Sequence, residues 1–368
     1  MSCGARAPAI AALSLLAAGC GNLADGRAAR DARIGQESAD GISVQIRDGL
    51  ATVRELTPSR LDLWLQAPGV TADVVVAAGA PPLEVVADNA LSDAEMTVLA
   101  PTGGPPVEIL PPAMANERRW RVTPRPDDRA LTLRIASPDA DAAGPWRFAV
   151  FADVQEAIEH VQDIYRRMSA DPTIRFAIFC GDLTSTGTPE QLARFRAEMS
   201  GLPIPIYATI GNHDLGTRDD LFHDYFGRAN FSFVHRNVRF TLLDTASATL
   251  APVVYDWLDG WLLEGIDRVH FAFAHIPPLD PIGTRNAAFA SRLEANKLLS
   301  LLASGHVDTT FYGHIHSYYA YSNAGIPAYI SGGGGAFPEQ LDGIGRHYLT
   351  VDVDADLQTV QVAVVRVD

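Results

Sequence analysis

The sequence holds 368 residues, 44 of them acidic and 29 basic, which gives a formal net charge of −15. This length suffices for two domains with buried cores, and 47% hydrophobic residues predict a globular chain and not a disordered one. The acidic balance argues against a broad nucleic-acid interface, because a surface that neutralises phosphates needs net Lys and Arg. It does not exclude phosphate chemistry at a local metal site.

Residues 1–19 have the three-part layout of a secretory signal, in which Arg6 precedes an apolar run over 9–18. This run is too short to span a bilayer stably. Residues 15–20, Leu-Leu-Ala-Ala-Gly-Cys, resemble a bacterial lipobox, in which the cysteine is lipidated and becomes the mature N-terminus. The resemblance implies an exported lipoprotein of the bacterial cell envelope, anchored through Cys20 and facing the periplasm or the outside. An ordinary cleaved signal with a coincidental cysteine is the alternative.

The next two segments differ in composition. Residues 20–40 are rich in Gly, Asn, Asp, Arg, Ala and Ser and predict a lipidated, flexible tether. From 41 to 140, short runs with period-2 alternation, such as 43–47 and 130–135, are separated by Pro and Gly clusters. This spacing predicts a small all-β sandwich domain. The order of the segments predicts that this domain lies nearer the membrane than the rest of the chain.

From Trp146 to residue 368 the pattern changes to strands that alternate with helices. A predicted strand at 147–152 is followed by apolar residues at helical spacing over 158–168, and similar units follow. Such repeats predict an α/β domain over 146–368. In sheets of this kind, residues that follow the carboxyl ends of the strands meet at one rim, where ligands bind.

Five predicted strands end in polar blocks. Carboxylate, amide and imidazole ligands without thiolate suit divalent metals such as Mn, Fe or Zn. The donors are too numerous for one four-coordinate ion and suit two ions that share a ligand. A phosphate cradle is one interpretation of the glycine run at 332–335, but no Gly-Lys-Ser or Gly-Lys-Thr follows it, so we expect a turn there. The five blocks are Asp153-Val-Gln155, Gly181-Asp182, Gly211-Asn212-His213-Asp214, His275 and Gly313-His314-Ile-His316.

In this order the blocks resemble the signature of the calcineurin-like metallophosphoesterase family, and the resemblance covers residues 146–368. It implies a four-layer α/β/β/α two-sheet sandwich behind the small β domain. It also implies hydrolysis of phosphoesters at two divalent ions, with in-line attack by a bridging hydroxide. The implied metal ligands divide into Asp153 and His316 for one ion, Asn212, His275 and His314 for the other, and Asp182 for both.

The same resemblance implies roles for two residues that bind no metal. His213 would contact the scissile phosphate and stabilise or protonate the leaving oxygen, and Asp214 would orient its neighbours. The implied substrate is the phosphoester of a small molecule or of a headgroup. Phosphatase and phosphodiesterase activities both remain open, because a fold does not fix a substrate.

Two positions depart from the family pattern. Gln155 stands where the first block commonly has histidine, so its amide oxygen could bind the first ion, hold it loosely or lie outside its coordination. Ser185 stands three residues after Asp182, where some relatives have an aspartate that supports the catalytic histidine. The departures motivate an alternative function, a catalytically weakened relative that serves as a binding module on the cell envelope.

Overall fold

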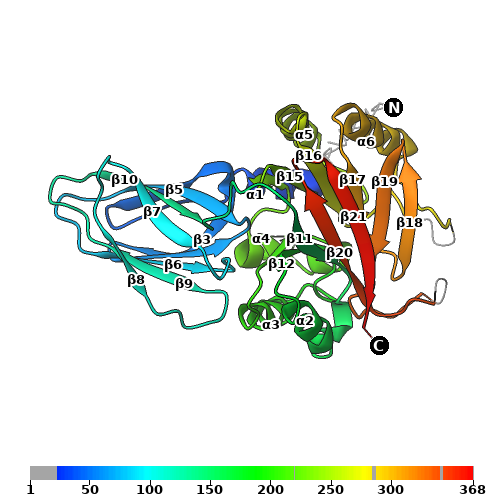
Figure 1. Cartoon of the computed structure of the whole chain (residues 1–368), viewed down its shortest axis with the longest axis horizontal. Coiled ribbons are helices and arrows are strands. Elements are labelled where there is room, and N and C mark those ends of the chain that lie inside the picture. The colour runs from blue at the N-terminus through cyan, green and yellow to red at the C-terminus, as the bar shows by residue number, and fades with distance from the viewer. Residues whose placement is uncertain (1–22, 219, 284–286, 340–342, 368) are drawn as a thin grey trace, which may run out of the picture.

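The computed structural model describes residues 23–218, 220–283, 287–339 and 343–367. Four β-sheets organise this part of the chain, and the molecule is elongated, with a β-sandwich at one end and an α/β part at the other (Figure 1). The signal segment 1–19 and Cys20 lie outside the described residues. None of the described helices has the length and apolar character that crossing a membrane requires.

Residues 36–136 form two five-stranded sheets whose apolar side chains alternate toward the shared interior, as the period-2 pattern predicts. The first sheet contains, in spatial order, β1 (Gln36–Ala39), β2 (Ile42–Ile46), β5 (Gly69–Val75), β10 (Ala130–Ala136) and β7 (Glu95–Ala100). The second contains β3 (Ala51–Thr57), β4 (Arg60–Leu65), β6 (Leu83–Asp88), β9 (Arg118–Val122) and β8 (Val107–Leu110).

The α/β part contains two mixed sheets, each named here after a central strand. The β11 sheet contains, in spatial order, β13 (Ile206–Thr209), β12 (Ile174–Cys180), β11 (Trp146–Phe151), β20 (His347–Asp354) and β21 (Thr359–Arg366). The β16 sheet contains β14 (Phe231–His235), β15 (Val238–Leu243), β16 (Val269–Ala274), β17 (Thr309–Tyr312), β19 (Ile326–Ser331) and β18 (Tyr318–Asn323).

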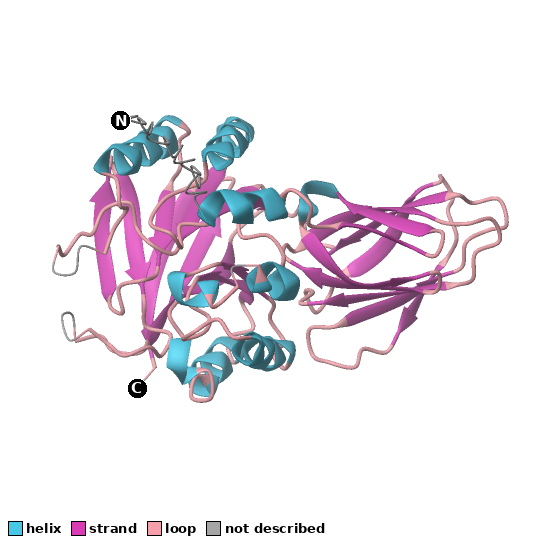
Figure 2. Cartoon of the chain, turned by 180° about the vertical axis from the view of Figure 1, so that it is seen from behind, coloured by secondary structure: helices cyan, strands magenta, loops and turns pink. Residues whose placement is uncertain are grey.

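Helices cover the outer faces of both sheets, which gives the expected α/β/β/α order (Figure 2). Between the sheets lies an aromatic layer that includes Phe148, Phe240 and Phe271, all fully buried. Strands covered on both faces become continuous apolar runs, and every residue of β16 is accordingly buried. The β11 sheet carries α2 (Gln162–Ser169), α3 (Pro189–Ser200) and α4 (Leu221–Phe226), and the β16 sheet carries α5 (Pro252–Gly265) and α6 (Arg292–Ser304).

Residues 23–39 do not form the flexible tether that their composition predicts. Residues 23–31 form α1 (Leu23–Asp31), which packs against α5 with Ala24 and Ala28 in the same apolar cluster. Strand β1 then pairs with β2 in the sandwich. The prediction was wrong because α1 buries small alanines and paired charges, which composition alone does not distinguish from a solvated segment. Because α1 lies on the α/β part, segment order does not place the β-sandwich nearer the proposed anchor.

Side-chain amides of the β-sandwich bind the main chain of the α/β part. Asn89 donates from Nδ2 to the carbonyl of Ile206 and accepts from its N–H at Oδ1, both at 2.9 Å. Gln66 makes the same pair of bonds with Arg228, both at 2.7 Å. Ile206 begins the edge strand β13, whose main chain has polar groups that need partners. These hydrogen bonds therefore join the β-sandwich to the α/β part. The domain boundaries expected at 41–140 and 146–368 stay predictions.

We expect acid to destabilise the protein through His235, whose ring packs edge-on against Trp146 and Phe176. Burial lowers its pKa from 6.5 to about 4, the carboxylate of Asp139 opposes this, and Arg175 and Arg236 add to it. In the unfolded chain the ring gains a proton near pH 6.5, so stability falls as the pH drops from 6.5 toward 4, by about 3 kcal/mol in all.

The measurement compares chemical denaturation of the wild type and His235→Phe across this pH range. As the pH drops, the free energy of unfolding should fall less steeply in the variant than in the wild type, because one titrating group is removed. The two slopes should differ by about 1.4 kcal/mol per pH unit. Equal slopes would contradict the assignment.

Candidate metal centre

Three turns at the rim of the α/β part contain a residue with a positive φ, a backbone conformation that residues other than glycine rarely adopt. Asp153, Asp182 and His314 have φ values of 63°, 60° and 71°. Such residues are uncommon and concentrate at functional sites. The turns follow the buried strands β11, β12 and β17, so the three side chains meet where the carboxyl ends of the strands converge.

Two clusters of potential ligand atoms lie at this rim. The first cluster consists of Asp153, Asp182 and His316, and the second of Asp182, His275 and His314; within each, the ligand atoms lie within 4.8 Å of one another. Asp182 belongs to both clusters and is fully buried, as is Asp153. Buried carboxylates need nearby positive charge, and these oxygen and nitrogen donors suit hard or borderline divalent ions. The residues therefore fit two divalent cations that share Asp182.

Burial and neighbouring charges shift the pKa values of Asp153 and His275 at the rim. Burial raises the pKa of Asp153 well above its usual range, and the nearby Asp182 carboxylate adds to this while His275 opposes it. For His275, burial works against the charged ring, but Asp182 and Asp153 outweigh it and raise the pKa to about 9. The two carboxylates thus depend on the positive charge of His275, and a bound cation would stabilise their ionised forms further.

Main-chain carbonyls fix the orientation of two imidazoles. His275 Nδ1 lies 2.8 Å from the carbonyl oxygen of Cys180, and His316 Nδ1 lies 2.8 Å from that of Phe337. Each Nδ1–H donates to its carbonyl, which directs Nε2 toward the carboxylates. His275 Nε2 lies 3.2 Å from Asp182 Oδ2, and His316 Nε2 lies 3.6 Å from Asp153 Oδ1.

Two amides complete the clusters. Asn212 Oδ1 lies 3.0 Å from His275 Nε2, beside the second cluster. Gln155 is 4% exposed, and its Nε2 lies 2.7 Å from Asp182 Oδ2 and 3.1 Å from His316 Nε2, beside the first cluster. The structure thus brings all seven side chains expected to be metal ligands to one rim, Gln155 included.

His213 lies at the rim but outside both clusters. Its main-chain N–H donates to Asp182 Oδ1 at 2.8 Å, and its Nδ1 lies 2.8 Å from the carbonyl oxygen of Ser185. The support expected from a carboxylate at position 185 therefore comes from the main chain of the same residue. The Ser185 side chain instead accepts a hydrogen bond from Gln191.

Asp214 ties two turns together beneath the rim. Its carboxylate accepts from the N–H groups of Gly211, Leu183 and Thr184 and from the Thr184 hydroxyl, at 2.9–3.1 Å. Burial, with the charge of Asp182 in addition, raises its pKa to about 6. A side chain at position 211 would collide with the main chain of Asp182, so glycine is required there.

The glycine run forms the expected turn beside the rim. Gly334 N–H donates to the carbonyl of Ala152 and Ala336 N–H to that of Asp153, both at 2.9 Å. Sequence reasoning missed Phe337, whose carbonyl orients His316, and Glu156, which accepts from the N–H of Phe337 at 3.2 Å. No residue type signals a main-chain acceptor, so the sequence offered no means of finding Phe337.

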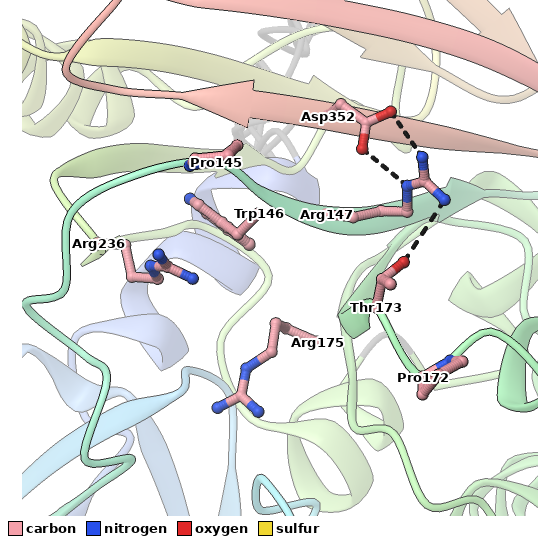
Figure 3. A pocket seen from close by; sticks show the side chains of 8 residues that line it. All are labelled: Pro145, Trp146, Arg147, Pro172, Thr173, Arg175, Arg236 and Asp352. Carbon is pink, nitrogen blue, oxygen red and sulfur yellow. Dashed lines mark hydrogen bonds and ion pairs between the residues drawn. The ribbon is translucent and has the colours of Figure 1, made fainter.

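A cavity of about 360 Å³ lies at the opposite end of the β11 sheet, where β11 and β12 begin (Figure 3). Its arginines already bind carboxylates: Arg147 contacts Asp352 at 2.8 Å, and Arg175 contacts Asp139 at 2.9 Å. This cavity therefore belongs to the packing of the segment that joins the two parts and not to the metal rim.

Comparison with known proteins points to one family. Residues 147–318 match the family model described as calcineurin-like phosphoesterase. Over 157 residues the chain is 27% identical to a 3′,5′-cyclic-nucleotide phosphodiesterase from Nostoc sp., covering 39% of this chain and 57% of that protein. The chain thus spans little more than half the length of this curated relative.

Two solved structures are also similar. A dimetal phosphatase from Danio rerio matches over 61% of this chain and 99% of its own, with 15% identity and a TM-score of 0.44. GAP50, from the inner membrane complex of Plasmodium, matches over 61% of this chain and 89% of its own, with 14% identity and a TM-score of 0.43.

Proposed function

We propose, from the match of residues 147–318 to the calcineurin-like phosphoesterase family model, that this chain hydrolyses phosphoesters at two divalent metal ions. The observation that carries the proposal is the pair of ligand clusters that share the buried Asp182. Asp153, Gln155, Asp182 and His316 would hold one ion, and Asp182, Asn212, His275 and His314 the other. When bound, the two ions activate water and withdraw charge from the phosphoryl group.

The chain's own residues supply orientation and a proton. With Nδ1–H held on the Ser185 carbonyl, the imidazolium form of His213 would carry a second proton on Nε2 and give it to the leaving oxygen, which leaves the neutral Nδ1–H ring. Asp214 would hold the turn of His213 against that of Asp182, through hydrogen bonds to both turns. Water attack on phosphorus and proton donation to the leaving group together complete the hydrolysis.

Gln155 would serve as a neutral ligand of the first ion. Its amide faces both Asp182 and His316, and rotation of the amide by half a turn would replace Nε2 with Oε1 at the same place. An amide oxygen binds more weakly than an imidazole and favours a harder ion. We therefore propose that the first ion is held less tightly than the second, with Mn, Fe and Zn as candidates.

The substrate class follows from the site and its relatives. The phosphoester of a small molecule or of a headgroup suits a rim at which His213, His314 and His316 are partly exposed, and the name of the Nostoc relative adds a cyclic nucleotide diester as a candidate. The alternative function is a binding module on the cell envelope with little or no turnover, which the departures at Gln155 and Ser185 motivate.

The test uses the full chain extracted in mild detergent, stripped of metal and reloaded with Mn, Fe, Zn or Mg. Hydrolysis of p-nitrophenyl phosphate, bis-p-nitrophenyl phosphate and 3′,5′-cyclic AMP is followed side by side. Metal-dependent turnover supports the hydrolase and ranks monoester against diester. Two bound ions without turnover would indicate a narrower substrate, and at most one bound ion without turnover would favour the binding module.

We also propose that the chain is an envelope lipoprotein anchored through Cys20, as the lipobox resemblance implies. Cys20→Ser should move the protein from the membrane fraction to the soluble fraction, because the acyl chains are lost. The measurement is immunoblotting of both fractions, with Cys180→Ser as the control, since Cys180 is buried between the sheets. A Cys20→Ser variant that stays in the membrane fraction would contradict the lipid anchor.

A further inference from the structure

Helix α1 carries two buried charges that bind distant segments of the α/β part. Arg27 and Asp31 are both 0% exposed. Arg27 binds Asp244 through two hydrogen bonds, Nε to Oδ2 at 2.6 Å and Nη2 to Oδ1 at 3.0 Å. Asp244 directly follows β15, so the first described helix is bound to the centre of the α/β part.

Asp31 makes the second connection. Its carboxylate accepts from the N–H of Ala229, from the N–H and the side-chain amide of Asn230, and from His223 Nε2, at 2.8–3.0 Å. Asn230 Oδ1 in turn accepts from the N–H of Asp244 at 2.8 Å. Arg27, Asp244, Asn230 and Asp31 thus form a closed arrangement, called here the α1 ring.

The α1 ring borders the segment that carries Asn212. The hydroxyl of Thr209 lies 2.9 Å from the carbonyl oxygen of Ala229 and 3.1 Å from that of Leu243, the residues before Asn230 and Asp244. Thr209 ends β13, three residues before Asn212. The ring therefore fixes the point from which the Asn212 turn departs.

The ring also borders the segment that carries His275. Thr245, the residue after Asp244, accepts from the N–H of Ile276 at 2.8 Å, and Ile276 follows His275 directly. Asn212 and His275 both belong to the proposed second ion. Asp153 and His316, the proposed ligands of the first ion, lie on other turns, those that follow β11 and β17.

A helix needs no buried charges to stay on a protein surface. Taking an arginine and an aspartate out of water is costly, and good pairing does little more than offset this cost. Buried ionic groups are better suited to fixing one arrangement of the groups that they contact. Here those groups are the ends of β13 and β15, which lead to the rim.

We infer that Arg27 and Asp31 are positioning residues for the second metal ion, because the α1 ring fixes the turns from which Asn212 and His275 approach Asp182. The inference rests on the proposed metal centre. Residues that orient metal ligands typically account for about 10- to 100-fold in metal affinity. Disturbing the α1 ring should therefore lower the affinity for the second ion by at least about tenfold. The affinity for the first ion should stay within about twofold of wild type.

The experiment is calorimetric titration of the metal-stripped full chain with Mn²⁺ in mild detergent. Arg27→Lys keeps the charge but cannot make both bonds to Asp244, and Asp31→Asn keeps the size but presents an amide group to N–H donors. Asn212→Ala identifies the binding step of the second ion. Leu133→Ala, in the core of the β-sandwich, is the control, because it lowers the melting temperature without touching the ring.

The expected result is selective loss of the second binding step in both ring variants, and both steps within about twofold of wild type in Leu133→Ala. Lower melting temperatures with both affinities unchanged would overturn the inference and leave α1 a purely structural element. A wild-type chain that binds only one ion would overturn the proposed dinuclear centre, and the inference with it.

Discussion

Asp182→Ala is expected to abolish metal-dependent hydrolysis and to leave fewer than two ions bound. The carboxylate of Asp182 belongs to both ligand clusters, so neither cluster keeps its carboxylate bridge after the substitution. The loss of several kcal/mol of charge stabilisation corresponds to a fall in kcat/KM of at least about 10³-fold. Steady-state kinetics with saturating metal and calorimetric counting of bound ions measure the two effects.

The substitution also removes two contacts that organise the rim. Asp182 accepts from the N–H of His213 at 2.8 Å and from Gln155 Nε2 at 2.7 Å, and the substitution removes the acceptor of both bonds. Asp224→Ala is the control, because Asp224 is an exposed carboxylate on α4 that should leave activity unchanged. Two bound ions and near-normal turnover in Asp182→Ala would rule out a shared carboxylate.

His213→Ala should lower kcat by about 10²–10³-fold while both ions remain bound. The imidazole belongs to neither ligand cluster, and only its main-chain N–H binds Asp182. If His213 gives a proton to the leaving oxygen, the loss should be larger for an alkyl phosphoester than for a p-nitrophenyl ester, whose leaving group needs no proton. Kinetics on both esters and metal counting test these expectations.

Ser185→Ala is the matched control for this prediction. Its main-chain carbonyl lies against His213 Nδ1, whereas its side chain contacts Gln191, so removing the hydroxyl should leave kcat within about twofold. A loss in Ser185→Ala as large as in His213→Ala would mean that the serine side chain supports the reaction. Loss of metal in His213→Ala would instead make His213 a ligand.

The sequence alone determined the fold class and the place of the rim. Apolar runs such as 176–179 end abruptly in glycine and polar residues, and this local contrast marks where a buried strand stops. Parallel strands with helical crossovers bring their carboxyl ends to one edge, so Asp153, Asp182 and His275 were expected to meet. The structure places them together, at the ends of β11, β12 and β16.

The partners of polar groups were decided only by the tertiary structure. The local sequence predicts that Arg27 and Asp31 are solvated charges. Their partners lie about two hundred residues away in the chain, so no local pattern indicates them. No local pattern around Asn89 indicates that its side-chain amide binds the main chain of Ile206 at the edge strand β13. A polar side chain is compatible with water and with a buried partner alike, and only the packed chain selects between them.

The same holds for the main-chain groups that orient the histidines at the rim. The orientation of His213 depends on the carbonyl of Ser185 and that of His316 on the carbonyl of Phe337. Every residue has a carbonyl, so residue type carries no information about which one will act as an acceptor. The sequence therefore determined which side chains gather at the rim, because strand ends are locally encoded. The tertiary structure decided how they are held, because main-chain acceptors and buried charge pairs exist only once distant segments pack together.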